Sequence, residues 1–164
     1  MTLGHPVTAF DPKRTSPAML HEPFSHSSRR HRDMITICVS SGEADISGTV
    51  KELREVALTL KALVGSGERS AVIPAQPCNP APYEQSLLEL AFTRLPGPTS
   101  VSADAHRLTV SGPDQFLAGF ASWFEFPQDA AHGTHNHFEP WPGDPDHSTE
   151  SLSLVVSVRH AGAV

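Results

Sequence analysis

The 164-residue sequence predicts an α+β fold: a two-layer sandwich in which a mostly antiparallel sheet of about five strands carries two helices on one face. Three observations favour it. Several short segments alternate apolar and polar residues with a period of two, as strands with one buried face do. Two longer segments space apolar residues three and four apart, as amphipathic helices do. The strands alternate and do not form solid apolar runs, which favours antiparallel pairing.

Residues 1–33 are expected to form a disordered N-terminal tail. They mix proline, serine, histidine and arginine without a period, and this composition buries too little apolar surface to offset chain entropy. The run SSRRHR indicates a solvated basic tail rather than a nucleic-acid arm. The first regular pattern begins at Met34, which raises the hypothesis that translation starts there. A single α+β domain is expected over residues 34–164.

The first strand and the first helix follow directly. The segment MITICVS, residues 34–40, alternates as a strand, and residues 40–48, SSGEADISG, are interpreted as a turn. Residues 49–64 then have helical spacing, with Gly65 as the expected stop. The predicted core face of this helix consists of Val50, Leu53, Ala57, Leu60 and Val64.

The middle of the chain is rich in proline over residues 66–86, where only a short strand near SAVI is expected. Two strands follow, SLLELAFTRL at 86–95 and HRLTVSG at 106–112. Both alternate, and a turn-rich segment separates them, so we expect a hairpin with a long loop.

A second helix is predicted over residues 111–126. Ser111 and Asp114 have capping-box spacing, and Pro113 stands where helices begin. The expected core stripe is Phe116, Leu117, Phe120, Trp123 and Phe124. Two last strands are predicted, THNHFEPW at 134–141 and SLSLVVSVR at 151–159, joined by a turn-rich loop.

The charge is placed unevenly. Residues 1–33 hold five Lys and Arg against three acids, so the remaining chain holds seven against fifteen. An acidic body disfavours nucleic acid and anionic membranes as partners and suits a basic protein. No apolar run has the length of a membrane span and the N-terminus lacks a secretory pattern, so a cytoplasmic location is expected. Cys38 and Cys78 are expected to be free thiols.

The segment HGTHNHFEPW, residues 132–141, raises the question of a metal site. If Phe138 points into the core, His135, His137 and Glu139 face solvent. His135 and His137 alone are two ligands, and Glu139 lies about 13 Å from His135 along an extended strand. A third ligand from His132, His147, His106 or Glu89 stays open. The alternative function is therefore a small metal-binding or metal-dependent hydrolase module using His135 and His137.

Other catalytic motifs do not occur in the sequence. It contains no GxSxG, no phosphate-binding glycine loop and no CxxC pair. The two cysteines have no local motif of a nucleophile, which favours inert thiols. We therefore expect no enzyme activity and no cofactor. A third interpretation, a regulatory module that responds to histidine protonation, has no identifiable partner group in the sequence.

Three segments of the last two-fifths of the chain carry a resemblance: LTVSGPDQFLAGFASWFEF, HGTHNHFEPW and ESLSLVVSVR. Together they resemble the bacterial polymorphic-toxin immunity proteins of immunity protein family thirty-two. The resemblance implies a small α+β protein, not an enzyme, that neutralises a cognate toxin by non-covalent association. An acidic body would suit a toxin with a basic surface. The candidate contact residues are His135, His137, Glu139, Asp144, Asp146 and Glu150.

Overall fold

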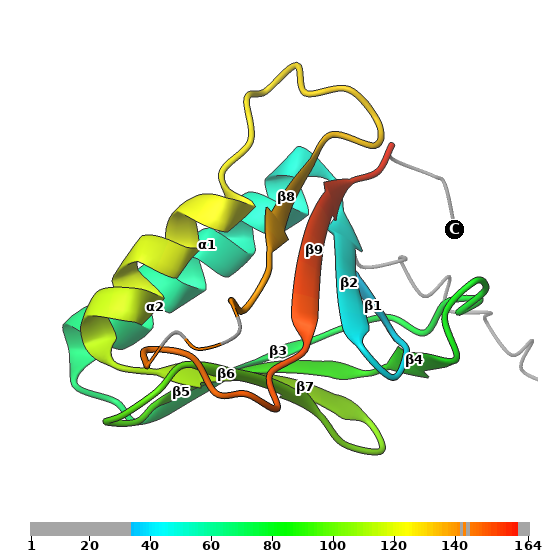
Figure 1. Ribbon diagram of the computed structural model, residues 1–164. Coiled ribbons are helices and arrows are strands. Elements are labelled where there is room, and N and C mark those ends of the chain that lie inside the picture. The colour runs from blue at the N-terminus through cyan, green and yellow to red at the C-terminus, as the bar shows by residue number, and fades with distance from the viewer. Residues whose placement is uncertain (1–33, 142, 144, 161–164) are drawn as a thin grey trace, which may run out of the picture. The chain divides into compact units, whose positions relative to one another are not determined.

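The computed structural model describes residues 34–141, 143 and 145–160. Within them two mixed sheets and two helices form an α+β fold (Figure 1). The five-stranded sheet, named sheet A, has the order β4 (Gln85–Leu87), β1 (Thr36–Val39), β2 (Glu43–Gly48), β9 (Ser153–Val158) and β8 (His135–Phe138). The four-stranded sheet B has the order β3 (Ser70–Pro74), β5 (Glu89–Arg94), β7 (Arg107–Gly112) and β6 (Ser100–Ala103).

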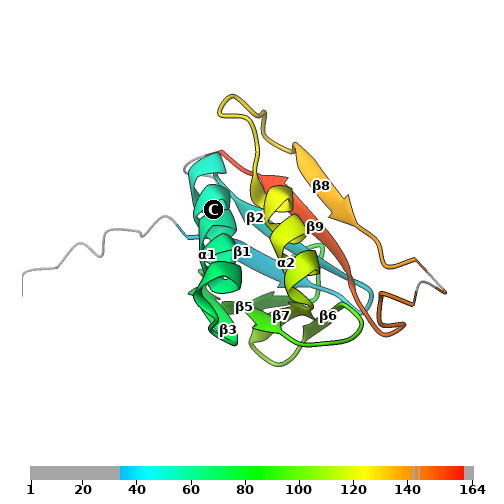
Figure 2. The same ribbon diagram turned by 90° about the vertical axis from the view of Figure 1, so that its left-hand side faces the viewer.

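The helices cover the angle between the two sheets. Helix α1 (Val50–Ser66) and helix α2 (Asp114–Phe120), which continues as the 3-10 helix η1 (Ala121–Phe124), lie side by side in front of both sheets (Figure 2). One core fills the space between these three groups of elements. Phe92 of sheet B, for example, meets Phe120 and Phe124 edge to face, with ring centroids 6.5 and 6.1 Å apart. The helices therefore cover the core side of both sheets. Within the described residues, no helix covers the face of sheet A that points away from this core.

The prediction of a single, mostly antiparallel sheet is wrong. Each sheet contains a parallel pair, β2 with β9 in sheet A and β5 with β7 in sheet B. The predicted strand 86–95 divides at Leu88, so that β4 joins sheet A and β5 joins sheet B. The predicted hairpin between residues 86–95 and 106–112 is also wrong. Strand β7 runs parallel to β5 and pairs antiparallel with β6 instead. Pairing partners depend on tertiary contacts that local alternation does not encode.

Strand β2 lies in a segment that was interpreted as a turn. Its residues alternate as a strand does, since Ala44 and Ile46 are fully buried while Glu43 and Asp45 are partly exposed. The glycines, serines and acids of this segment are common in turns, and the small apolar side chain of Ala44 weakens the strand signal. Strand β2 provides the two carboxylates of sheet A, those of Glu43 and Asp45, and the sequence analysis missed both of them.

Helix α1 confirms its prediction and has a complete capping box. The Thr49 side chain accepts from the backbone N–H of Glu52, and the Glu52 carboxylate accepts from that of Thr49. The helix ends at Ser66 and not at Gly65, and its C-cap is Gly67, whose φ of 78° is readily adopted only by glycine.

Helix α2 is shorter than predicted. Ser111 belongs to β7, and Pro113 caps the helix without a side-chain hydrogen bond. The capping box predicted from Ser111 and Asp114 is therefore wrong. The aromatic stripe is confirmed, with Phe120 and Phe124 buried in the core and Trp123 packed against it.

A buried ion pair ties the end of β9 to the start of α1. Arg159 is 9% exposed and Glu52 5%, and Nη2 of Arg159 lies 3.1 Å from Oε2 of Glu52. The same nitrogen donates to the carbonyl of Met34 at 2.7 Å. This contact joins three segments that are far apart in the sequence.

Among the described helices, none is both long and apolar enough to cross a membrane.

Candidate functional site: the outer face of sheet A

The outer face of sheet A is the face that points away from the core. Its side chains come from alternate positions of the five strands, because the intervening positions are buried. Strand register places Cys38 opposite Asp45, Asp45 beside Val155, and Val155 opposite His137. The outer face comprises Cys38, Glu43, Asp45, Ser47, Ser86, His135, His137, Val155 and Ser157.

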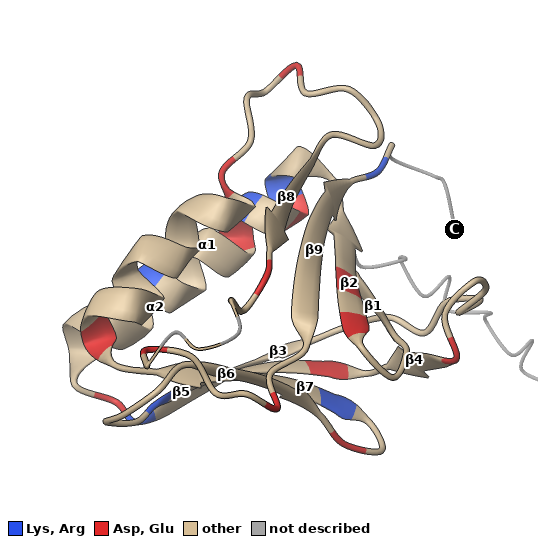
Figure 3. Cartoon of the chain, in the orientation of Figure 1, with Lys and Arg blue, Asp and Glu red and all other residues tan. Residues whose placement is uncertain are grey.

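This face is acidic and lacks cationic residues other than histidine. Strand β2 contributes Glu43 and Asp45, and none of the five strands of sheet A contains Lys or Arg (Figure 3). The described Lys and Arg residues lie instead on the helices, on sheet B and at its ends, and directly after β9. The local charge of the outer face is thus negative, and protonated histidine is the one group of the face that can offset it.

Glu43 is the centre of one polar group on this face. The Tyr83 hydroxyl donates to its Oε1 at 2.9 Å, and Nε2 of His137 lies 3.8 Å from its Oε2. Burial, followed by the hydrogen bond to Glu43, raises the pKa of Tyr83. Tyr83 therefore stays a neutral donor near pH 7.

Asp45 is the second carboxylate of the face. Its Oδ1 accepts from the hydroxyl of Ser157 on the neighbouring strand at 3.0 Å. Burial raises the pKa of Asp45, an effect that the Ser157 hydrogen bond and the charge of His135 oppose and the charge of Glu43 reinforces. His135 on β8 is the register partner of Ser157, the residue that donates to Asp45 of β2.

The loop between β3 and β4 folds over the edge of this face and brings two thiols together. Sγ of Cys78 lies 3.0 Å from Sγ of Cys38, and both are free cysteines. Cys38 is on the side of β1 opposite its apolar residues, yet it is only 9% exposed because this loop covers it. Burial is the main cause that raises the pKa of Cys38 to about 12. Cys38 is therefore a protonated thiol at neutral pH.

The arrangement is suited to binding and poorly suited to covalent catalysis. A nucleophile needs its deprotonated form at working pH, and the environment of Cys38 and Tyr83 disfavours that form. What the face offers is a set of fixed hydrogen-bond acceptors, namely the carboxylates of Glu43 and Asp45, beside two exposed imidazoles.

The structure places the open candidates for a third metal ligand away from His135 and His137. Across the described residues, no three side chains of His, Cys, Asp or Glu gather as a metal site requires. His147 packs its ring against Phe138, on the core side of β8, and His132 stacks on His160 at a centroid distance of 5.2 Å. The other two candidates also have partners elsewhere, His106 beside Asp104 and Glu89 with Arg107.

An acidic groove borders sheet A where its β1–β2 turn approaches sheet B. The groove has a volume of about 540 Å³, and three carboxylates line it, those of Glu84, Asp104 and Glu150. No Lys or Arg is among its lining residues. Of the predicted contact residues, Glu150 is thus placed next to two acids that the sequence analysis did not single out.

The remaining predicted contact residues do not form one surface. His135 and His137 lie on the outer face, and exposed Glu139 follows directly after β8. Asp146 lines a different groove, of about 550 Å³, whose apolar wall includes the rings of Phe116 and Trp123. Asp144 lies outside the described residues.

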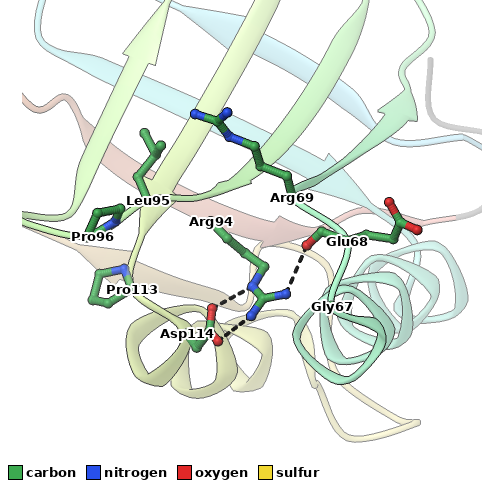
Figure 4. Close-up of a pocket in the computed structure, with 8 residues that line it drawn as sticks. All are labelled: Gly67, Glu68, Arg69, Arg94, Leu95, Pro96, Pro113 and Asp114. Carbon is green, nitrogen blue, oxygen red and sulfur yellow. Dashed lines mark hydrogen bonds and ion pairs between the residues drawn. The ribbon is translucent and has the colours of Figure 1, made fainter.

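A third depression lies between the end of α1 and the start of α2, and its Arg94 is paired with residues of the protein itself. The guanidinium of Arg94 donates from Nε to Oδ1 of Asp114 at 2.6 Å and from Nη1 to the carbonyl of Glu68 at 3.0 Å (Figure 4). Figure 4 shows the side chain of Arg69 extending away from this pair. The depression of about 480 Å³ is therefore held by internal pairing and is not part of the candidate site.

Comparison with known proteins adds no relative: no family model matches the chain, and neither does any curated protein or solved structure. Sequence reasoning missed Glu43, Asp45 and Tyr83. The alternation of Ala44 and Ile46 was the signal that would have shown the first two on one strand face.

Proposed function

We propose that this protein is an immunity-type inhibitor that binds a cognate bacterial toxin without covalent chemistry. The outer face of sheet A and the acidic groove form the contact surface, and the toxin presents a basic patch to them. The observation that carries this proposal is the absence of Lys and Arg from all five strands of sheet A, beside a groove lined by three carboxylates. Complementary charge speeds encounter and selects the partner.

The surface also has features expected of a stable contact. The carboxylates of Glu43 and Asp45 are fixed by Tyr83 and Ser157, so they lose little conformational freedom when a cation binds. Arg side chains of a partner would pair with such carboxylates in a bidentate geometry. Exposed His135 and His137 add donors at the edge strand of the sheet.

The direct test is co-expression with the product of the adjacent gene, tested as a toxin. We expect restored growth and co-purification of the two chains in stoichiometric amounts. A toxin that stays active, or that does not co-purify, contradicts the proposal. Stoichiometric metal in untagged protein, lost in the His135→Ala/His137→Ala variant, would instead favour the metal-binding alternative.

A matched pair of variants locates the contact surface. Glu84→Lys/Glu150→Lys reverses two charges of the acidic groove, whereas Glu55→Lys/Glu68→Lys makes the same net change at exposed sites on and just after α1. The groove variant should slow association roughly tenfold or more, and the helix variant much less. Equal effects would mean that overall charge, and not this surface, attracts the toxin.

A further inference from the structure

We propose that Cys38 and Cys78 form a reversible disulfide when the protein meets a small-molecule disulfide of the glutathione type. The two residues are the only cysteines of the chain. An internal disulfide therefore has one connectivity. This inference does not depend on the proposed function, and its test requires no toxin.

The geometry brings the two sulfur atoms close to bonding distance. Their separation of 3.0 Å is about 1 Å longer than a disulfide bond of about 2.05 Å. They come from different parts of the fold, Cys38 from β1 and Cys78 from the loop between β3 and β4. Contact across 40 residues of sequence is set by the tertiary structure, and bond formation requires the two sulfur atoms to approach by about 1 Å.

Ser86 holds the loop in this position. It is the register partner of Cys38 on the neighbouring strand β4. Its hydroxyl accepts from the backbone N–H of Cys78 at 3.1 Å and lies 3.4 Å from Sγ of the same residue. The approach of the two thiols is thus built into the sheet and does not depend on a chance position of the loop.

The two thiols differ in their access to solvent. Cys78 is half-buried, whereas Cys38 is buried beneath the loop. A bulky disulfide such as oxidised glutathione can therefore reach Cys78 first. Cys38 is then placed to resolve the product, because its sulfur already faces that of Cys78.

The disulfide between Cys38 and Cys78 would form in two thiol–disulfide exchange steps. The Cys78 thiol loses its proton and attacks one sulfur of oxidised glutathione, which breaks that disulfide, leaves Cys78 joined to one glutathione and releases the other as a thiol. The Cys38 thiol then loses its proton to solvent and attacks the Cys78 sulfur, releasing the second glutathione. This step is slow at neutral pH because burial disfavours the Cys38 thiolate, and the contact between the two sulfur atoms offsets this by making the attack intramolecular. Overall the protein loses two hydrogen atoms, and one oxidised glutathione becomes two reduced molecules.

The disulfide would fasten the loop to sheet A. The same loop carries Tyr83, which donates to Glu43 on the outer face. Closing the bond removes conformational freedom from the unfolded chain, and the effect grows with the length of the closed loop. Oxidation should therefore stabilise the fold and hold Tyr83 in place.

The test uses the purified full chain, fully reduced and then incubated with oxidised glutathione. We expect the intact mass to fall by two hydrogen atoms and the accessible thiols of the denatured protein to fall from two to none. Peptide mapping should recover Cys38 linked to Cys78. The melting temperature of the oxidised protein should rise by on the order of 10 °C. Two remaining thiols, stable glutathione adducts or linked dimers would each overturn the proposal.

Single variants test the order of attack. Cys38→Ala should accumulate a mixed disulfide of glutathione on Cys78, whereas Cys78→Ala should stay unmodified while it is folded. Equal modification of both variants would overturn the assigned order. The double variant should show no change of melting temperature with the oxidant. The mass measurement on the wild-type chain decides the proposal even if Cys38→Ala does not fold.

Discussion

At the scale of single residues, Glu52 has two structural tasks. Its carboxylate completes the capping box of α1 by accepting from the backbone N–H of Thr49 at 2.7 Å. The same Oε2 lies 3.1 Å from the guanidinium of Arg159, and both side chains are almost fully removed from solvent. A buried charge is tolerated only while it is paired, so the two residues depend on each other.

Replacing Arg159 tests this dependence. Arg159→Ala leaves the Glu52 carboxylate buried without its counter-ion and should lower the free energy of unfolding by about 3–5 kcal/mol. Urea titration followed by circular dichroism measures the change. The control is Lys61→Ala, which removes an exposed pair with Glu125 and should cost about 0–1 kcal/mol. Similar losses in both variants would mean that burial of the pair is energetically unimportant.

Asp45 should make stability depend on pH. Its pKa is raised in the folded protein, so the folded state holds the proton more tightly than the unfolded state. Stability therefore falls as pH rises from about 3.9, the ordinary value for Asp, through the raised pKa. Asp45→Asn, which can still accept from Ser157, should raise the melting temperature by a few degrees at pH 7 and lose this advantage below pH of about 4.

Asp104→Asn is the control with the opposite sign. The backbone N–H groups of His106 and Arg107 donate to Asp104, and the first of these contacts is the main cause of its lowered pKa. This variant should be less stable than wild type at pH 7, and the difference should shrink as pH falls through the lowered pKa. A gain for Asp104→Asn at pH 7, or a loss for Asp45→Asn, would contradict these directions.

At the scale of elements, strand β8 is an edge strand held by one neighbouring strand and by two side chains, Phe138 and Asn136, whose amide donates to the carbonyl of Trp123 at 2.8 Å. It pairs with β9 alone, and Phe138 is its one fully inward residue, 6% exposed. The Phe138 ring meets those of Phe116, Phe120 and Trp123 at centroid distances of 6.0, 6.0 and 5.7 Å. This anchor keeps the two histidines of β8 on the outer face.

Phe138→Ala should therefore loosen the whole strand. Loss of the ring from its aromatic pocket should cost about 3–5 kcal/mol of unfolding free energy. Hydrogen exchange at the amides of β8 should accelerate more than at those of β2. His137→Ala, on the exposed side of the same strand, should change stability by less than about 0.5 kcal/mol. A comparable loss for His137→Ala would show that the outer face contributes to stability.

Patterns confined to one element were predictable from the sequence. Helix α1, the aromatic stripe of α2 and the direction of Phe138 all follow from periodicity, which local burial enforces. The division of 86–95 at Leu88 and the two parallel pairs were not predictable, because they depend on which strands meet in space. The contacts of Tyr83 with Glu43 and of Cys78 with Cys38 join residues 40 positions apart, and no local pattern encodes them.

At the scale of the whole molecule, four of the seven described Lys and Arg side chains pair with carboxylates of the protein itself. Lys61, Arg94, Arg107 and Arg159 each form an ion pair with a carboxylate. None of these pairs lies on the outer face of sheet A, so the carboxylates of that face keep their charge for an outside partner. The outer face of sheet A therefore carries negative charge that no Lys or Arg of its own strands offsets.

This separation of charge predicts a strong dependence of toxin binding on salt. Since screening sets in over about 10 Å at 0.1 M ionic strength, the association rate should fall steeply between about 0.05 and 0.5 M salt while the dissociation rate changes little. Stopped-flow or surface-binding kinetics measure both rates. Glu84→Lys/Glu150→Lys should flatten the salt dependence of association, and a slope equal to that of wild type would exclude the groove from steering.

The division at Leu88 protects the two sheets against slippage. Strands β4 and β5 are joined by this single residue, whose backbone N–H donates to the carbonyl of His106 at 2.8 Å. A shift of one residue in either sheet would turn every side chain of that strand to the wrong face. Because β4 and β5 are joined by one residue, a shift in the register of one strand also shifts the other. A register error in one sheet would therefore raise the free energy of both sheets.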